Sequence, residues 1–498
     1  MYPNCKRITR QEMSASRKRS CPSRLAAGGG EDRLSSLPDG VLGHILSFLP
    51  TKEAGRTAVL ARRWRYMFAE VHTMSFEQDR VTHMGDDYTF YLESQERRSL
   101  NGNFLDDVCA AVLARRRCGG VAPSTSLRSF RLFFEDDEGY TEWDGPMVES
   151  LINHVLQQSN QELRLDLRFW TGEHCASGSD SDSYEDPWRK AWCYPHLPAR
   201  LFRCPYLRSL RVGHCRLTPP EAVVLPSLET LHLTDIDEPC APIQRLISGC
   251  PRLADLTLEA CSKLKRVSVL HKRLRRLALR YCHNVVGVAV DASELTTLCY
   301  RGALPPESLL TLHGSPRIAS CTMDICGTIP SKKGEFAAFR KLLGNFVDVK
   351  HLHLQSSRLG CGIESSLFVG FPAFSNLRRL ELSGCLEDSS IVVAVAMILE
   401  KTPNLEALSL FLTPGSQEGG RIRRAQPGMS LPCLRQINLV HYRGGEAQRT
   451  LVKLLLRNAL VLQELCVVFS KGPFALQSNL MNEMKGWAAN KSAKMMFL

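Results

Sequence analysis

The chain is rich in side chains that could bind metals or act as nucleophiles, with 19 cysteines and 14 histidines among its 498 residues. Structural zinc sites use closely spaced pairs such as C-x-x-C, and the sequence contains no such pair. The histidines do not stand at zinc-finger spacing either. The sequence therefore predicts no metal site and no cofactor.

Motifs for nucleotide or acyl chemistry are also missing from the sequence. It contains no phosphate-binding loop, G-x-S-x-G elbow, H-E-x-x-H helix or Rossmann fingerprint. The glycines at 28–30 lie in a polar stretch, without the flanking strand and helix that a phosphate loop needs. We expect a non-catalytic protein whose chemistry, if any, resides in other subunits.

Several cysteines follow a structural pattern instead. Each stands three residues after the last apolar residue of an L-x-x-L-x-L segment; they are Cys215, Cys261, Cys282 and Cys385. A buried thiol at a turn packs as a small hydrophobe with weak hydrogen-bonding ability. The basic N-terminal residues are not followed by an apolar segment, so they do not read as a secretory signal, and we expect these thiols to be reduced, in the cytoplasm, the nucleus or both.

The L-x-x-L-x-L pattern recurs from Leu207 to Val467. Successive copies start 21 to 25 residues apart between Leu207 and Ile318, and 28 or 29 apart from Val349 onward. The alternating second and third apolar positions indicate a short strand with one buried face, and such a strand can bury that face only against neighbouring copies. The pattern resembles leucine-rich repeats, whose period is about 20–29 residues. The resemblance implies an α/β fold, a curved solenoid with parallel strands on its concave face and helices or loops on its convex face.

Residues 37–68 form a second pattern, of short amphipathic helices. Pro38 and Asp39 read as a helix start with Asp39 as the N-cap, and Thr51 after Pro50 can cap the next helix. Apolar residues then recur on one helical face: Val41, Leu42, Ile45, Leu46 and Leu49. About 30 residues in short helices cannot form an adequate core, so this face needs a partner in the chain or outside it.

This segment resembles the F-box. The resemblance rests on Leu37-Pro38-Asp39, Ile45-Leu46-x-x-Leu49-Pro50, Arg56, Leu60 and Arg63-Trp64-Arg65. It implies a three-helix domain that docks on a Skp-type linker protein and, through it, on a cullin-based ubiquitin ligase. The contact residues that it implies are Leu37, Pro38, Val41, Leu42, Ile45, Leu46, Leu49, Leu60 and Trp64. The alternative is an ordinary helical hairpin packed on its own domain.

These patterns divide the chain into five parts. We expect a disordered basic leader at 1–33, an F-box at 34–76, and a linker with degenerate first repeats at 77–196, including an acidic loop at 171–187. Leucine-rich repeats follow at 197–430. The last part, 431–498, resembles the FBD region of plant F-box proteins through the run 451–460 and the apolar residues that follow it, and is expected to be a terminal repeat and cap.

Composition limits the classes of partner. The net charge is +12, and about half of the excess lies in residues 1–24, where Arg17-Lys18-Arg19 could serve as a nuclear import signal. The rest of the chain is mixed in sign, so we expect no nucleic acid partner. No apolar run approaches the ~18 residues that span a bilayer, so we expect no membrane partner either.

The favoured hypothesis is a substrate-recognition adaptor of an SCF-type ubiquitin ligase. The concave strand surface would bind a protein substrate, because repeat arrays commonly bind partners there. Candidate residues lie between the inward leucines: Arg211, His232, His353 and Glu381. The alternative is a repeat scaffold that binds proteins without recruiting a ligase.

Overall fold

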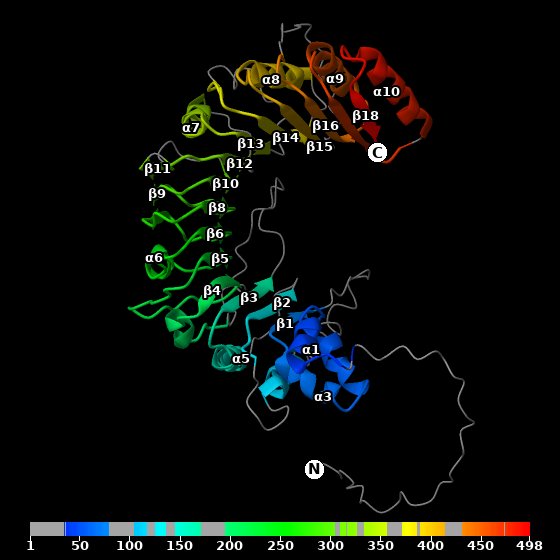
Figure 1. Cartoon of the computed structure of the whole chain (residues 1–498). Coiled ribbons are helices and arrows are strands. Elements are labelled where there is room, and N and C mark those ends of the chain that lie inside the picture. The colour runs from blue at the N-terminus through cyan, green and yellow to red at the C-terminus, as the bar shows by residue number, and fades with distance from the viewer. Residues whose placement is uncertain are drawn as a thin grey trace, which may run out of the picture.

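The structure is a computed structural model. It describes residues 34, 36–78, 104–116, 125–135, 145–170, 195–303, 309–314, 316–325, 333–355, 371–385, 389–413, 431–472 and 474–498. The predicted leader 1–33 and the predicted acidic loop 171–187 lie outside these residues. A helical domain sits at one end of a long curved band of strands, and α10 lies near the other end (Figure 1).

The band is one 15-stranded parallel sheet. Its order is the chain order once three strands are omitted: β1 Thr73–Glu77, β2 Ser129–Glu135, β3 Leu163–Trp170, β4 Leu207–Gly213, β5 Thr230–Thr234, β6 Asp255–Glu259, β8 Arg276–Arg280, β10 Thr297–Gly302, β12 Ser320–Ile325, β13 His351–Gln355, β14 Arg379–Cys385, β15 Ala407–Thr413, β16 Gln436–Tyr442, β17 Glu464–Phe469 and β18 Lys494–Phe497. This confirms the predicted solenoid of parallel strands.

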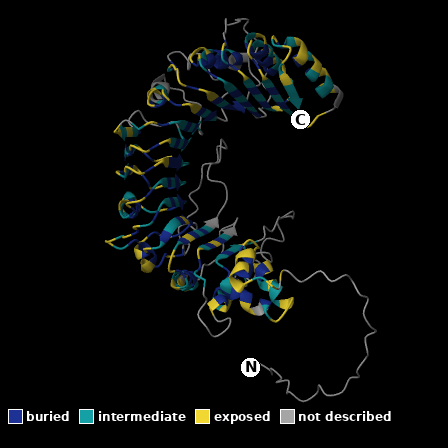
Figure 2. Cartoon of the chain, in the orientation of Figure 1, coloured by how far each residue is buried: buried dark blue, intermediate teal, exposed yellow. Residues whose placement is uncertain are grey.

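The inward leucines explain why the strands stack. Leu231, Leu256 and Leu277 pair in register across β5, β6 and β8 and are fully buried. The same alternation of buried and half-buried positions recurs along the array (Figure 2). Because each strand is too short to bury its own apolar face, the core exists only where neighbouring repeats meet.

The turn after the strands has a fixed geometry in the first half of the array. Four residues there adopt positive φ angles of 48° to 54°: His214, Asp235, Ala260 and Tyr281. Their amides continue the ladder; the amide of Ala260, for example, donates to the carbonyl of Arg280 at 2.8 Å. Residues with side chains tolerate this backbone region because the ladder on either side holds it.

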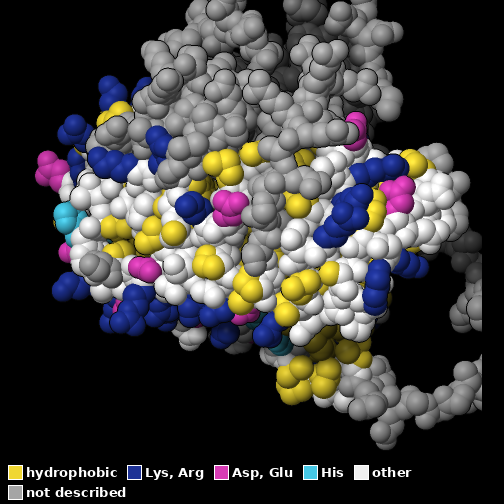
Figure 3. Space-filling view, turned by 90° about the horizontal axis from the view of Figure 1, so that it is seen from above, with side chains coloured by type: hydrophobic (Ala, Val, Ile, Leu, Met, Phe, Trp, Pro, Cys, Tyr) yellow, Lys and Arg dark blue, Asp and Glu magenta, His cyan; other side chains and the backbone are white. Residues whose placement is uncertain are grey.

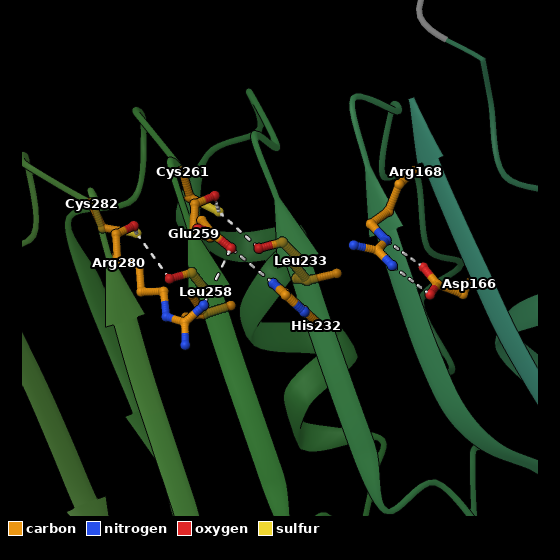
Figure 4. Close-up of polar contacts among 9 residues, drawn as sticks. All are labelled: Asp166, Arg168, His232, Leu233, Leu258, Glu259, Cys261, Arg280 and Cys282. Carbon is orange, nitrogen blue, oxygen red and sulfur yellow. Dashed lines mark hydrogen bonds and ion pairs between the residues drawn. The ribbon is translucent and has the colours of Figure 1, made fainter. Parts of the chain in front are cut away.

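The predicted role of the turn cysteines is confirmed where their side chains are described. The Cys261 thiol lies 4.0 Å from the Leu233 carbonyl and the Cys282 thiol 3.5 Å from the Leu258 carbonyl, each in the preceding repeat (Figure 4). Burial raises the pKa of Cys215 to about 12, which keeps that thiol protonated and unreactive. The side chain of Cys385 is not described.

Helices line much of the convex side (Figure 1). They are a helix over 104–116, α5 Gly145–Gln157, the short η4 Ala199–Arg203, α6 Cys240–Ser248, α7 Lys333–Gly344, α8 Ser389–Glu400, α9 Glu446–Asn458 and α10 Phe474–Trp487. In the second half, where the repeat period is longer, α7 to α10 have 12 to 14 residues each.

Between α6 and α7 the convex side differs from the expectation of helices or loops. Three short strands form a second parallel sheet there: β7 Arg266–Val269, β9 Gly287–Asp291 and β11 Leu310–His313. A repeat of about 21 residues leaves too few residues on the return path for a helix, whereas an extended segment covers the same distance in fewer residues. Alternating valines, such as Val288 and Val290, bury one face of this sheet.

The N-terminal domain consists of α1 Asp39–Leu46, α2 Thr51–Arg56, η1 Thr57–Val59, α3 Trp64–Met67 and η2 Phe68–Glu70. Helix α1 lies so close to η2 that a Cβ on Gly43 would stand 2.5 to 2.9 Å from Glu70 atoms. A glycine is required at this crossing. The domain then runs into β1 after only two residues, so it is fused to the sheet.

The predicted capping roles of Asp39 and Thr51 are wrong. The N-cap positions are Pro38 and Pro50, and neither helix start has a side-chain cap. Asp39 instead accepts hydrogen bonds from the Arg63 guanidinium, which also reaches the Leu37 carbonyl at 2.6 Å. The Thr51 hydroxyl accepts the Ser75 amide at 2.7 Å. Both side chains therefore fix tertiary contacts that the local sequence does not reveal.

A buried arginine joins the helical domain to the first repeats. Arg115 is fully buried and donates to the Val71 carbonyl at 2.6 Å, the Thr125 carbonyl at 2.6 Å and the Gln158 side chain at 2.9 Å. Burial lowers the pKa of Arg115 to about 10, so the guanidinium stays charged at neutral pH. One side chain thus connects the segment after η2 with the end of α5.

We predict that Arg115→Met lowers the free energy of unfolding by about 2–4 kcal/mol, because the buried acceptors lose their donor. Urea denaturation measures the change. The matched control is Arg116→Met on the same helix, since Arg116 is exposed and only reaches Gln157 at 3.3 Å. The control should change stability by about 0.5 kcal/mol or less. Equal effects of the two substitutions would contradict the junction role of Arg115.

Candidate functional site

The outer face of α1 carries exposed apolar side chains. Val41 is 43% exposed, Ile45 39%, Phe48 77% and Leu49 40%. Val41 and Ile45 share one face of α1, and Phe48 and Leu49 lie in the turn that follows it. Phe48 packs edge-on against His44, with 4.9 Å between the ring centroids. A soluble domain does not normally leave a whole helical face of this kind in water.

Further exposed apolar residues follow on the neighbouring helices. Val59 is 86% exposed, Leu60 69% and Tyr66 57%. We define the helical apolar surface as Pro38, Val41, Ile45, Phe48, Leu49, Val59, Leu60 and Tyr66. Exposed residues lie on the outer side of these helices, while buried ones face the sheet (Figure 2). Hydrophobic side chains gather at the lower edge of Figure 3, where this domain projects beyond the array.

The structure divides the nine predicted contact residues. Pro38, Val41, Ile45, Leu49 and Leu60 belong to the helical apolar surface, and Leu37 is half-buried against the core. Leu42, Leu46 and Trp64 do not reach the surface, with exposures of 0%, 1% and 8%. They pack in the core of the domain itself, because α1 must also bury a face against the segment leading into β1. In this chain, these three residues support the surface from beneath, and their assignment as direct contacts stays a prediction.

Two prominent members of the surface were missed from the sequence. Phe48 and Val59 are its most exposed large side chains. Phe48 falls in an unspecified position of the Ile45-Leu46-x-x-Leu49-Pro50 pattern, and Val59 precedes Leu60. In the sequence, both are simply hydrophobic residues next to a helix end. That pattern does not show whether a residue is exposed or buried.

The concave side of the array carries the second group of predicted residues. Strand register places Arg211 beside His232, and His353 beside Glu381, in one continuous row across the sheet. Thr257, Ala278, Cys299 and Thr322 separate the two pairs. The four predicted residues therefore lie on one face but do not form one site.

The first pair lies next to an ionic cluster that the sequence reading missed. His232 Nε2 stands 3.1 Å from Glu259, whose carboxylate is 4.0 Å from the Arg280 guanidinium (Figure 4). Glu259 and Arg280 lie two positions further along their strands than the row of His232, and so face the same side. The alternation of side chains along a strand could have predicted from the sequence that Glu259 and Arg280 face the concave side.

The second pair belongs to another cluster. His353 lies 3.0 Å from the Ser383 hydroxyl and 3.6 Å from Glu381, and Arg301 pairs with Asp324 at 2.7 Å. Burial lowers the pKa of His353, with Glu381 opposing the shift, so its imidazole is neutral near pH 7. Burial raises the pKa of Asp324, while Arg301 opposes that shift. These contacts order the side chains of the concave surface.

Metal binding finds no support in the described residues, which contain no group of three or more His, Cys, Asp or Glu side chains suited to an ion. Within the same ranges, no helix has the length and apolar character to cross a membrane. The described residues thus present two candidate surfaces, one apolar on the helical domain and one polar on the concave face.

Comparison with known sequences places these surfaces in context. The profile of the F-box domain matches residues 34–73, which hold the helical apolar surface. The profile described as "FBD-associated F-box protein At5g56370, LRR repeats" matches residues 183–318 in the first half of the array.

Similar proteins are found in Arabidopsis thaliana. The chain is 25% identical over 476 residues to the F-box/FBD/LRR-repeat protein At2g26030, covering 90% of this chain and 94% of that protein. It is 29% identical over 415 residues to the F-box/LRR-repeat protein At3g59200, covering 76% and 69%. It is 32% identical over 238 residues to the F-box/LRR-repeat protein At4g14103, covering 47% and 51%.

Adjacent residues of α1 test the division between core and surface. We predict that Leu46→Ala lowers the free energy of unfolding by about 2–5 kcal/mol, because it leaves a cavity in the core. Ile45→Ala removes a similar volume from the surface and should cost about 1 kcal/mol or less. Urea denaturation of the two variants measures the difference. A larger loss for Ile45→Ala would show that the helix is rotated relative to the structure.

Proposed function

Because the chain belongs to the plant F-box/FBD/LRR-repeat family, we propose that it is a substrate-recognition adaptor of an SCF-type (Skp–cullin–F-box) ubiquitin ligase. An F-box implies binding to a Skp-type protein in general, and members of this family are generally non-catalytic adaptors. The proposal assigns the helical apolar surface to the Skp-type linker protein, through it to a cullin, and the concave face to a protein substrate.

The helical apolar surface carries the proposal. The domain beneath it is already packed, with Leu42, Leu46 and Trp64 buried, yet eight further apolar or aromatic residues remain in water. Fully burying a large aliphatic or aromatic side chain contributes about 1.5–3 kcal/mol. A few such anchors suffice for a specific interface, and aromatic residues commonly dominate it. Phe48 is the strongest candidate, since 77% of it is available for burial.

The junction supports the adaptor role through geometry. β1 follows the helical domain directly and pairs with β2, and Arg115 bonds across the same boundary. A linker protein bound to the helices would therefore hold the whole curved array in one orientation. Substrate held by the array would remain near the ligase subunits, and such proximity raises the rate of transfer. The adaptor would act in the cytoplasm, the nucleus or both.

Recruitment of the linker protein can be tested with surface substitutions that spare the core. We predict that Phe48→Asp combined with Val59→Asp abolishes co-purification of a co-expressed Skp-type linker protein. Both side chains are almost fully solvated, so the unfolding midpoint should stay unchanged. The two new aspartates would be buried only in the complex with the linker protein, where burying an unpaired charge is costly.

The matched control is Val224→Asp, an exposed apolar residue outside the helical apolar surface, at 55% exposure. It should retain the linker protein. If the wild-type chain folds but captures no Skp-type protein, the alternative of a repeat scaffold without ligase recruitment is favoured. Retention of the linker protein by the double variant would place the interface elsewhere.

A further inference from the structure

Charges on the concave face cancel between neighbouring strands over most of the array. Asp255 and Glu259 on β6 face Arg276 and Arg280 on β8, with separations of 3.7 and 4.0 Å. Further along, Arg301 pairs with Asp324 at 2.7 Å, Arg379 and Glu381 stand two positions apart on one strand, and Glu464 lies in register with Lys494. These strands offer little net charge to a partner.

Strands β2 to β4 depart from this balance. Their described outward positions hold four arginines and one acid: Arg131, Arg164, Arg168 and Arg211 with Asp166. Glu162, just before β3, adds a second acid at the strand start and pairs with Arg164 at 3.4 Å. On the neighbouring β1, Glu77 adds one negative charge at the strand end. The concave face therefore has a local positive excess at the end nearest the helical domain.

Asp166, the acid at the centre of these strands, is already paired with an arginine. Asp166 accepts two hydrogen bonds from Arg168, at 2.7 and 2.8 Å, and lies 3.9 Å from Arg131 (Figure 4 shows the Asp166–Arg168 pair). The Arg168 guanidinium also lies over the Phe133 ring, 5.4 Å from its centroid. The Arg168 guanidinium is thus held in place by Asp166 and Phe133, and some of its N–H donors still face solvent.

Two neighbouring arginines keep most of their charge available. Arg211 is exposed and has no ion-pair partner among the described residues. Arg131 has only the long contact to Asp166, and 44% of its side chain is exposed. In register, Arg131, Asp166 and Arg211 occupy consecutive places in one row. With strands ~4.8 Å apart, the two guanidiniums flank Asp166 within a span of about 10 Å.

We propose that the concave surface of β2–β4 binds an acidic segment of a protein, whose anionic side chains are engaged by Arg131 and Arg211 beside the fixed Arg168 fork. This inference rests on the proposed function, because it names the class of substrate segment that the adaptor would hold. Guanidinium groups recognise carboxylates and phosphates through paired hydrogen bonds. The segment carries aspartate, glutamate or phosphoserine.

The size of the patch favours a peptide over a nucleic acid. A nucleic acid needs a long positive track, since several phosphates must be neutralised together. The positive region spans only three strands. It is bounded by Glu77 on one side and by Asp255 and Glu259 on the other. An extended peptide with two or three anionic side chains fits that span and avoids the flanking acids.

Fluorescence polarisation with the full chain tests the proposal. The probes are a short labelled peptide rich in Asp and Glu, its phosphoserine counterpart, and a Lys-substituted peptide of the same length. We expect the two anionic peptides to bind and the cationic one not to bind. Affinity should fall as NaCl rises from about 50 mM to about 500 mM, as screening predicts. The double variant Arg131→Glu/Arg211→Glu should weaken binding at least about tenfold.

The matched control is Arg379→Glu, which reverses an exposed charge on the same face at the distant strand β14. It should change the affinity about twofold or less. Absence of binding by both anionic peptides, or equal weakening by the control, would overturn the proposal. So would capture of a single-stranded RNA with the same sensitivity to the double variant.

Co-purification of the Skp-type linker protein is measured on the same variants. Loss of peptide binding with the linker protein retained is the expected result, because the two surfaces lie on different parts of the chain. A wild-type chain that binds the linker protein but no anionic peptide defeats this inference alone. A chain that binds the peptide but no linker protein defeats the ligase assignment alone.

Discussion

The structure depends on the inability of one short strand to bury its own apolar face. Each strand of the main sheet has only four to eight residues and needs neighbouring strands, so the array is stable only as a continuous stack. The two ends are the exposed points of such a stack. At one end, the strand β1 is part of the segment that leaves the helical domain. The first strand of the array therefore has helices packed beside it from the outset.

This fusion completes the core of the helical domain. Short helices of this kind are too small to form a full core, yet Leu42 and Leu46 are buried because the segment leading to β1 lies beneath them. Gly43 permits the close crossing, and Arg115 satisfies carbonyls on both sides of the junction. The apolar face that remains outside is therefore supplementary to the core and available to a partner.

The helical apolar surface and the concave face would bind partners through different interactions. The helical apolar surface would gain from removal of water, which suits a permanent subunit. The concave face is polar, and its charges are mostly paired within the array, as Arg301 with Asp324. Internal pairing weakens non-specific attraction of charged molecules, so an unbalanced region such as β2–β4 stands out electrostatically. One chain can thus bind two partners of different chemistry without competition between them.

The sequence alone determined the repeat period, the inward leucines, the turn cysteines and the helical motif, because each is a local pattern of residue type. The strands β2 and β3 and helix α5 were also predictable from alternation and amphipathicity. Tertiary structure decided which side of α1 stays exposed. The apolar stripe of that helix is wide enough to serve both the core and the surface, so the sequence alone did not show that Leu42 and Leu46 face the core while Val41 and Ile45 stay exposed. It also decided the partners of Asp39 and Thr51, the convex strands of the short repeats and the ion pairs of the concave face. These depend on distances between residues far apart in the chain, which packing sets and local sequence does not.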